Sequence, residues 1–335
     1  MERSARPVIM LDVARVAGVS IQTVSRVLND SPAVRADTRA RVLDAVRDLG
    51  YRPNAIARAL VNRRSATIGA VAVDTRNHGP ITTLLALERA ARSAGYGLTV
   101  VTPDPPTAAG FTDAYRALVS QSVAGAVLIA PQDLAEPVAP PSGLPTVAVE
   151  ADSTPGVPTA RLDQRHGVTC AVEHLVALGH RRIDHVAGPQ DWPEARERLA
   201  GWRAALAAHG LAEPPVGTGD WTAAAGHRWG HTHAADPAVT AVVAANDEVA
   251  VGILRACAEL GVAVPGELSV VGFDDIPLAA WLIPGLTTVR QDFDALGSTA
   301  LQLLLRLLDD TAETAAPVPP LPELVVRRST GPPGR

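Results

Sequence analysis

The sequence predicts an α/β protein in which an all-α segment of three short helices precedes two doubly wound subdomains with parallel sheets. From residue 66 onward, apolar runs of strand length alternate with amphipathic helical segments. These runs consist mostly of Val, Ala and Ile without polar alternation, which is typical of parallel strands covered by helices on both faces. The chain has 335 residues, of which 47% are hydrophobic, so it can bury more than one core.

Three short helical segments open the chain, over residues 10–17, 21–28 and about 36–49. Gly18 ends the first segment, because glycine adopts positive φ without a steric penalty. Ser20 is a good N-cap for the second segment, and Gly50 stops the third. Since only the short turn at residues 17–20 separates the first two segments, they predict a helix-turn-helix.

The body of the chain contains two sets of alternating strands and helices, one before and one after about residue 163. The expected strands are residues 67–73, 97–101, 125–130, 145–149, 183–187, 240–245 and 268–273. The expected helices include residues 81–94, 167–178, 194–209, 222–234 and 248–260. Pro-rich stretches at 103–106, 137–145 and 317–322 predict surface loops.

Charge is divided unevenly along the chain. Residues 1–64 contain 12 Arg and 6 acidic residues, whereas residues 65–335 contain 18 Arg and 29 acidic residues. A basic first segment on an acidic body indicates that only the first segment binds a polyanion. A solvated basic helical face would carry the same charges.

Several classes of protein are disfavoured by the sequence. The two cysteines, Cys170 and Cys257, make neither a disulfide framework nor a four-cysteine metal site. The first residues lack the pattern of a secretion signal, and no apolar run approaches the ~20 residues that span a membrane. A Walker loop and a nucleophile elbow are also missing. We therefore expect a cytoplasmic protein that has no cofactor, no membrane contact and no enzymatic activity.

The second helical segment has one face suited to the major groove of DNA. Val24 and Val27 are expected to point into the core, while Ile21, Gln22, Ser25 and Arg26 can point outward. Arg pairs with guanine and Gln with adenine through two hydrogen bonds, each pair giving ~1–3 kcal/mol of discrimination. The residues better suited to phosphates, which position a protein without specifying sequence, are Ser20, Thr23 and Asn29. The alternative for any one of these side chains is a capping or solvated role.

Polar side chains follow the expected strands of the body. Ligands in open α/β sheets bind beyond the carboxyl ends of the strands, and the residues there are Asp74, Glu150, Asn246, Asp247, Asp274 and Asp275. Such acids and amides suit a polyhydroxylated ligand. Arg198 adds a forked donor and Trp221 a flat apolar face. The alternative is that each acid caps the helix that follows it, which explains Asp247 and Asp275 best.

Two parts of the chain resemble the LacI/GalR family of regulators. The first is LDVARVAGVSIQTVSRVLN at 11–29. The second is a series of body motifs, in the same order and at similar spacing: EHLVALGH at 173–180, AGP at 187–189, RLAGW at 198–202, GDW at 219–221, AND at 245–247, SVVGFDD at 269–275 and IPGLTTVRQDF at 283–293. The resemblance runs from about residue 8 to residue 330.

This resemblance implies a domain organisation with a periplasmic-binding-protein-like core. The implied parts are a helix-turn-helix headpiece at 8–50, a hinge at 51–64, an N-terminal core subdomain at 65–162 and 293–320, and a C-terminal core subdomain at 163–292 and 321–330. In the headpiece, the resemblance implies that Ile21, Gln22 and Arg26 read base edges, with the apolar Ile21 against a thymine methyl.

The resemblance also implies that residues 53–61 form a hinge helix that folds on the operator. Leu60 would then enter the minor groove and kink a central base step, with Asn54 and Arg58 as nearby polar contacts. The alternative is an ordinary linker turn in which Leu60 packs on the body.

In the body, the resemblance implies a ligand cleft between the two subdomains. The implied ligand contacts are Arg198, Trp221, Asn246, Asp274, Gln291 and Phe293 on one side, and Gly79 and Pro80 on the other. Four positions depart from the family pattern: Glu194 replaces a small polar residue, Glu150 a shorter carboxylate, and Asn77 and Thr83 aliphatic residues. These departures make part of the pocket more polar and weaken the case for a β-galactoside, while a sugar remains expected.

The function expected from this resemblance is a sequence-specific repressor whose operator affinity is modulated by a small sugar, with a galactoside inducer as the first candidate. The expected partners are palindromic double-stranded operator DNA, a sugar effector and a second copy of the chain. We expect a dimer, because the final residues 329–335 contain no leucine heptads of the kind that mediate tetramers. The alternatives are a regulator of the same family that responds to another sugar, a purine or a sugar phosphate and, with less support, a solute-binding protein.

A histidine-rich segment offers a further alternative for the function, an enzyme with a bound metal ion. His227 and His231 are four residues apart within an expected helix, so they share one face and form a possible metal pair. Because no acidic partner accompanies them in the sequence, no metal site is expected.

Overall fold

The computed structural model describes residues 8–28, 33–51, 65–130, 138–151, 154, 156–309 and 318–334. The chain divides into two compact units, Met1–Ala66 and Thr67–Arg335. Each unit has its own hydrophobic core, so each can be described by itself.

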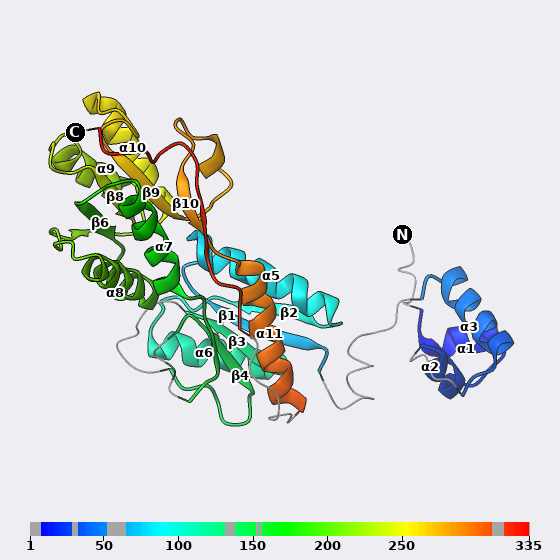
Figure 1. Cartoon of the computed structure of the whole chain (residues 1–335). Helices are drawn as coiled ribbons and strands as arrows, with labels where there is room; N and C mark the ends of the chain where they lie inside the picture. The colour runs from blue at the N-terminus through cyan, green and yellow to red at the C-terminus, as the bar shows by residue number, and fades with distance from the viewer. Residues whose placement is uncertain are drawn as a thin grey trace, which may run out of the picture. The chain divides into compact units, whose positions relative to one another are not determined.

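The first unit contains the three predicted helices, α1 (Met10–Ala17), α2 (Ile21–Leu28) and α3 (Ala36–Asp48) (Figure 1). Gly18 has a φ of 66° and its N–H donates to the Ala14 carbonyl oxygen, which ends α1 as predicted. The core consists of buried residues from all three helices, and its best buried members are Val13, Val24 and Val42. The helix-turn-helix expected from the sequence is therefore present.

The second unit begins with a parallel five-stranded sheet of order β2-β1-β3-β4-β5. Its strands are β1 (Thr67–Ala72), β2 (Gly97–Val101), β3 (Ala126–Ile129), β4 (Thr146–Val149) and β5 (Thr159–Ala160). Side chains of β1, β3 and β4 that alternate along each strand enter two different cores. Helices α5 (His78–Ser93) and α11 (Phe293–Asp309) cover one face, and α6 (Ala108–Ser120) covers the other.

A second sheet of six strands follows, in the order β11-β10-β9-β8-β6-β7. Its strands are β6 (Ile183–Ala187), β7 (Gly217–Thr218), β8 (Ala241–Ala244), β9 (Ser269–Asp274), β10 (Thr287–Arg290) and β11 (Glu323–Val325). Only the pairing of β10 with β11 is antiparallel among these described strands. Helices α7 (Gln164–Ala177) and α8 (Pro193–Ala208) cover one face, and α9 (Ala223–His233) and α10 (Asp247–Leu260) the other.

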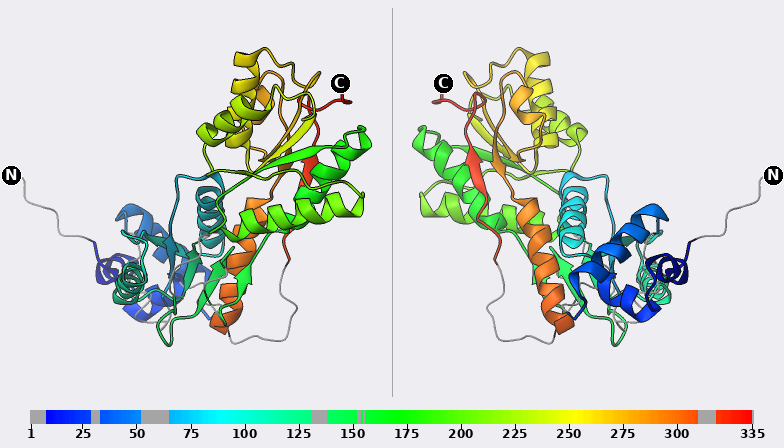
Figure 2. Two further views of the ribbon diagram at one scale, coloured as in Figure 1. Left: turned by 90° about the vertical axis from the view of Figure 1, so that its left-hand side faces the viewer. Right: turned by 90° about the vertical axis from the view of Figure 1, so that its right-hand side faces the viewer.

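The chain passes between the two sheets more than once. After β10 of the second sheet, α11 packs against α5 and against strands of the first sheet, and β11 then joins the second sheet. Figure 2 shows α11 in orange beside the first sheet and β11 in red beside the second. Each sheet with its helices is therefore built from more than one stretch of the chain.

The α/β class with two parallel sheets predicted from the sequence is confirmed. The expected strands and helices are present, with ends that differ by a few residues from the predicted ones. The short strands β5, β7, β10 and β11 and the helices α6 and α11 were not among the predicted segments. Within the described residues, no helix is both long and apolar enough to cross a bilayer.

Candidate functional site

The exposed face of α2 carries the side chains predicted to meet DNA. Val24 and Val27 are buried, whereas Ile21, Gln22 and Arg26 are exposed. Ile21 is 47% exposed, comparable with other aliphatic side chains of this unit such as Leu11 and Val16. The exposed face of α2 thus presents one apolar and two hydrogen-bonding side chains to solvent.

Ser20 and Thr23 are tied to each other at the start of α2. The Ser20 Oγ accepts a hydrogen bond from the Thr23 N–H at 3.1 Å, and the two hydroxyl oxygens lie 2.9 Å apart. Ser20 therefore caps the helix as its residue type predicted. Ser25 is only half-buried. The remaining predicted DNA contacts, Asn29, Asn54, Arg58 and Leu60, lie outside the described residues.

A shallow hollow beside α2 brings Arg26 together with two arginines that the sequence reasoning did not single out. Arg26, Arg35 and Arg41 line it together with the hydroxyls of Ser20, Thr23 and Thr38. No acidic side chain is found among its described lining residues. Such a surface suits phosphate oxygens. The sequence signal for Arg35 and Arg41 was only the excess of arginine in the first 64 residues.

In the second unit, one cleft between the two sheets brings together all of the predicted ligand residues. Its space is about 560 Å³, counting the part open to solvent, which falls within the usual size of small-molecule sites. The predicted residues in its lining are Asn77, Gly79, Pro80, Glu150, Glu194, Arg198, Trp221, Asn246, Asp274, Gln291 and Phe293. Asp74, which also follows a strand, is not part of this lining.

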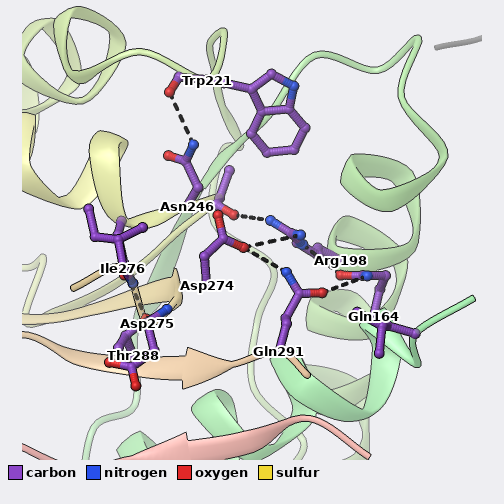
Figure 3. A network of polar contacts seen from close by, with 12 residues as sticks. Gln164, Arg198, Trp221, Asn246, Asp274, Asp275, Ile276, Thr288 and Gln291 are labelled. Carbon is purple, nitrogen blue, oxygen red and sulfur yellow. Dashed lines mark hydrogen bonds and ion pairs between the residues drawn. The ribbon is translucent and has the colours of Figure 1, made fainter. Parts of the chain in front are cut away.

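Four residues that line the cleft form a closed ring of polar contacts (Figure 3). The Arg198 Nε donates to the Gln164 Oε1 at 2.9 Å, the Gln164 Nε2 donates to the Gln291 Oε1 at 2.8 Å, and the Gln291 Nε2 donates to the Asp274 Oδ1 at 2.6 Å. The Arg198 Nη2, 3.7 Å from the same Asp274 oxygen, closes the ring. Since each donor faces an acceptor, the orientation of both amide groups is defined by their neighbours.

Arg198 is held from several sides. Its Nη1 donates to the Ala245 carbonyl oxygen at 2.5 Å, and its guanidinium lies 3.9 Å from the ring centroid of Phe273 and 5.4 Å from that of Trp221. Arg198 and Asp274 are both less than a tenth exposed. A buried arginine with these contacts is a rigid donor for a ligand.

Three carboxyl groups in the cleft are buried and resist ionisation. Burial raises the pKa of Glu150 to about 7, although the Leu162 N–H donates to its Oε1 at 2.7 Å. Burial raises the pKa of Glu194 well above its usual value, and the nearby Glu150 raises it further. Burial also raises the pKa of Asp274 to about 6, against the opposing charge of Arg198. At neutral pH the cleft therefore carries less negative charge than three carboxylates would.

Two of these acids have an uncommon backbone conformation. Glu150 has a φ of 51° and Asp274 a φ of 111°, in the region that non-glycine residues rarely adopt. Each lies at the carboxyl end of a strand and turns its side chain into the cleft. Strained residues of this kind gather at functional sites.

Asn246, rather than Asp247, caps the helix that follows β8. The Asn246 Oδ1 accepts from the Val249 N–H at 2.8 Å, and its Nδ2 donates to the Trp221 carbonyl oxygen at 3.1 Å. Asp247 instead accepts from the Ile276 N–H at 2.8 Å and from the Thr288 hydroxyl at 2.5 Å. The interpretation of Asp247 as a helix cap was therefore wrong, because α10 starts at Asp247 itself, one residue earlier than that role requires.

Asp275 is not a helix cap either. Its carboxylate accepts from the Arg290 Nε at 2.7 Å and from the Arg327 Nη2 at 2.6 Å. The interpretation failed because a short 3-10 turn, Ala279–Trp281, follows β9 and not a regular helix. Asp275 thus ties the end of β9 to β10 and to the C-terminal segment.

Gln164 and Trp192 are members of the cleft that the sequence reasoning missed. Gln164 is the first residue of α7 and links Arg198 to Gln291. Trp192 packs edge-on against Trp221, with their ring centroids 5.2 Å apart. Trp192 could have been found from the sequence, because tryptophan is rare in this chain. The residues around Gln164 give no sign that its side chain is buried in a cleft and not exposed at the start of a helix.

Comparison with known proteins agrees with both units. Residues 9–54 match the family described as bacterial regulatory proteins, lacI family, and residues 172–330 match a periplasmic binding protein-like domain. The lactose operon repressor of Escherichia coli (strain K12) is 34% identical over 329 residues, covering 97% of this chain and 91% of that protein.

Solved structures of transcriptional regulators are also similar to this chain. A lac repressor dimer bound to operator and the anti-inducer ONPF aligns with a TM-score of 0.83 at 33% identity, covering 97% of this chain and all of that chain. A complex of the transcriptional regulator CelR with cellobiose aligns with a TM-score of 0.67 at 30% identity, with the same coverage.

A helix-turn-helix unit joined to a two-sheet unit with a central cleft defines a DNA-binding transcriptional regulator. This chain belongs to the lacI family of bacterial regulatory proteins. The resemblance drawn from the sequence motifs is thereby confirmed, and so is the expectation of a regulator in place of an enzyme, because the relatives are transcriptional regulators.

Proposed function

We propose that this regulator is a repressor that binds a palindromic operator as a homodimer and releases it when a neutral glycoside fills the cleft. A galactoside is the first candidate, because the relative with 34% identity is named the lactose operon repressor. A cellobiose-like disaccharide is the second, because one structural neighbour is a cellobiose complex.

The DNA half of the proposal is supported by α2 and its arginines. Arg26 and Gln22 are exposed next to Ile21, so two donors and one apolar contact can meet base edges in the major groove. Arg35 and Arg41, which line the hollow beside α2, are proposed phosphate contacts.

The effector half is carried by one observation: the cleft contains buried polar atoms that lack a partner among the described residues. These atoms are the Glu194 Oε2, a carboxyl oxygen, and the Trp221 Nε1, a donor, and both residues line the cleft. A buried unsatisfied polar atom costs about 1–3 kcal/mol. A ligand bearing adjacent hydroxyls can satisfy both atoms, since each hydroxyl donates and accepts.

Charge disfavours a sugar phosphate as the effector. Glu150, Glu194 and Asp274 line the cleft, and its only described arginine is Arg198. Three sides of that arginine are already used by Gln164, Ala245 and Asp274. A phosphate would need several free donors and would be repelled by any ionised acid.

Effector occupancy can act on the headpiece through the angle between the two sheets. The cleft draws residues from both halves, such as Asn77 from the first and Arg198 from the second. The subdomain boundaries that we propose near residues 162, 292 and 320 are the points at which the chain crosses. A ligand that prefers one closure by ~2.7 kcal/mol changes operator affinity ~100-fold.

A dimer is supported by an exposed apolar loop after β9. Leu278, Trp281 and Ile283 are 52%, 81% and 98% exposed. Three large apolar side chains within six residues are typical of a protein interface. We propose that a second copy of the chain covers this loop, because a two-fold symmetric operator is bound by a dimer.

The effector proposal is tested by calorimetry of the full-length chain against galactosides, cellobiose, other neutral sugars, purines and sugar phosphates. We expect saturable binding of a neutral glycoside, together with weaker binding of the chain to its operator in the same solution. The matched variants are Glu194→Gln, which keeps the shape of the side chain, and Glu213→Gln, which changes an exposed acid outside the cleft lining.

Glu194→Gln should change effector affinity at least tenfold, and Glu213→Gln should leave it unchanged. Binding of a purine or a sugar phosphate alone, or equal affinity in both variants, would show that the effector assignment is wrong. Failure to prefer any palindromic DNA over random duplex would overturn the operator half independently.

A further inference from the structure

Two histidines on α9 meet an acid from α10 on the surface of the second unit. His227 and His231 lie one turn apart on α9, and Glu259 lies in the last turn of α10. The expectation that the histidine pair has no acidic partner was therefore wrong. Glu259 is 28 residues beyond His231 in the chain and is brought to it only by the packing of the two helices.

Glycines explain why the two helices approach so closely. A Cβ added at Gly226 would lie 1.9 Å from the Val249 carbonyl oxygen, and one added at Gly252 would lie 1.8 Å from the Ala223 carbonyl oxygen. The backbones of α9 and α10 are thus in direct contact. This close approach brings side chains of the two helices, such as those of His231 and Glu259, within hydrogen-bond distance.

The three side chains offer their ligand atoms to one point. The His227 Nε2 and His231 Nε2 lie 2.8 Å and 2.7 Å from the same Glu259 Oε2, and the three atoms are all within 4.8 Å of one another. Ligand atoms around a tetrahedral zinc ion are about 3.4 Å apart, since Zn–N and Zn–O bonds are close to 2.1 Å. Each Nε2–Oε2 distance therefore needs to lengthen by about 0.6–0.7 Å, which these partly exposed side chains permit.

The second oxygen of Glu259 is already occupied. The Arg255 Nε donates to the Glu259 Oε1 at 2.6 Å, one turn before Glu259 on the same helix. This contact orients the carboxylate so that the Oε2 faces the histidines. Metal ligands are commonly held in this way by a hydrogen bond to the atom that does not bind the metal.

We propose that His227, His231 and Glu259 bind a divalent transition-metal ion, of which Zn²⁺ is the best match, through two Nε2 atoms and one carboxylate oxygen. Two imidazoles in a set of three favour zinc, copper or nickel over magnesium or calcium, which prefer oxygen ligands. Water completes the coordination. The ion replaces the two Nε2–H···O hydrogen bonds, and each neutral imidazole then carries its proton on Nδ1.

This metal site is separate from the effector cleft. The cleft residues Trp221 and Asn246 lie just before the first turns of α9 and α10, whereas Glu259 lies at the far end of α10. An ion there would tie the two helices together across their glycine seam. Its expected effect is on the stability of the second unit.

Zinc titration of the full-length chain, with any affinity tag removed, tests the proposal. We expect one zinc ion per chain by calorimetry, visible absorption bands from Co²⁺ bound at the same site, and a melting temperature about 5 °C higher when zinc exceeds Kd by about a hundredfold. Zinc affinity should fall at least tenfold in Glu259→Gln and further in the double variant His227→Asn/His231→Asn.

The matched control is His209→Ala, which removes an exposed histidine at the end of α8. It should bind zinc as the unaltered chain does. Equal zinc affinity in the control and in the His227→Asn/His231→Asn variant would overturn the proposal, as would the lack of any saturable zinc binding by the unaltered chain. Because His227, His231 and Glu259 are partly exposed, the variants are expected to fold, which circular dichroism verifies.

Discussion

Replacing Arg198 by methionine tests whether the polar ring organises the cleft. The guanidinium donates to Gln164 and to the Ala245 carbonyl oxygen and neutralises Asp274. Methionine fills a similar volume against the ring of Phe273 but leaves these acceptors without their donor. Loss of one partner from a buried ion pair costs about 3–5 kcal/mol.

The cost should lie at the lower end of that range, about 3 kcal/mol, because Asp274 can take up a proton. Burial has already raised the pKa of Asp274 to about 6 with Arg198 present, and without Arg198 it must rise further. For a unit of this size, 3 kcal/mol lowers the melting temperature by about 6–12 °C. The loss should be smaller at pH 5 than at pH 8, since the neutral carboxyl group needs no cation.

The assay is thermal unfolding of the full-length chain at both pH values, followed by tryptophan fluorescence. Adding Asp274→Asn to Arg198→Met removes the unpaired charge while Gln291 keeps its acceptor, so the double variant should recover about half of the loss. Unchanged stability in Arg198→Met, or a loss that is the same at pH 5 and pH 8, would refute the reasoning.

Four further predictions concern other parts of the chain. Arg26→Ala should lose about 1–3 kcal/mol of discrimination between operator and random duplex, while nonspecific binding persists with a somewhat smaller salt slope; fluorescence anisotropy at several salt concentrations measures both. Glu150→Gln should reduce the pH dependence of the melting temperature. The folded-state pKa of Glu150, about 7, lies above its usual value of 4.5, so its contribution to stability is full below pH 4.5 and is lost as the pH rises through 7. Gly226→Ala should lower stability by about 2–3 kcal/mol, because its Cβ would meet the Val249 carbonyl oxygen; urea unfolding measures this. Trp281→Ser should shift the chain from dimer to monomer in light scattering and weaken operator binding without changing the fold.

Each of these predictions has an outcome that contradicts it. Undiminished operator preference in Arg26→Ala would remove α2 as the recognition helix. An identical pH profile in Glu150→Gln would show that another group controls the titration. Full stability of Gly226→Ala would mean that α9 and α10 can separate freely, and an intact dimer in Trp281→Ser would place the interface elsewhere.

Local patterns in the sequence were enough for the headpiece and for the strand ends. The turn at Gly18, the cap at Ser20 and the buried Val24 follow from residue type and helical period, which act over a few residues. Acids such as Glu150 and Asp274 could be placed at the cleft because parallel strands all end at one edge of their sheet.

Only the tertiary structure decided how these side chains pair. The ring of Arg198, Gln164, Gln291 and Asp274 joins α8, α7 and the ends of β10 and β9, and Glu259 reaches His231 through a contact between two helices. Such contacts join residues far apart in the chain and leave no period in the sequence. The physical reason is that a side chain's partner depends on how close two backbones pack, and in this protein glycine seams and strand ends determine that distance.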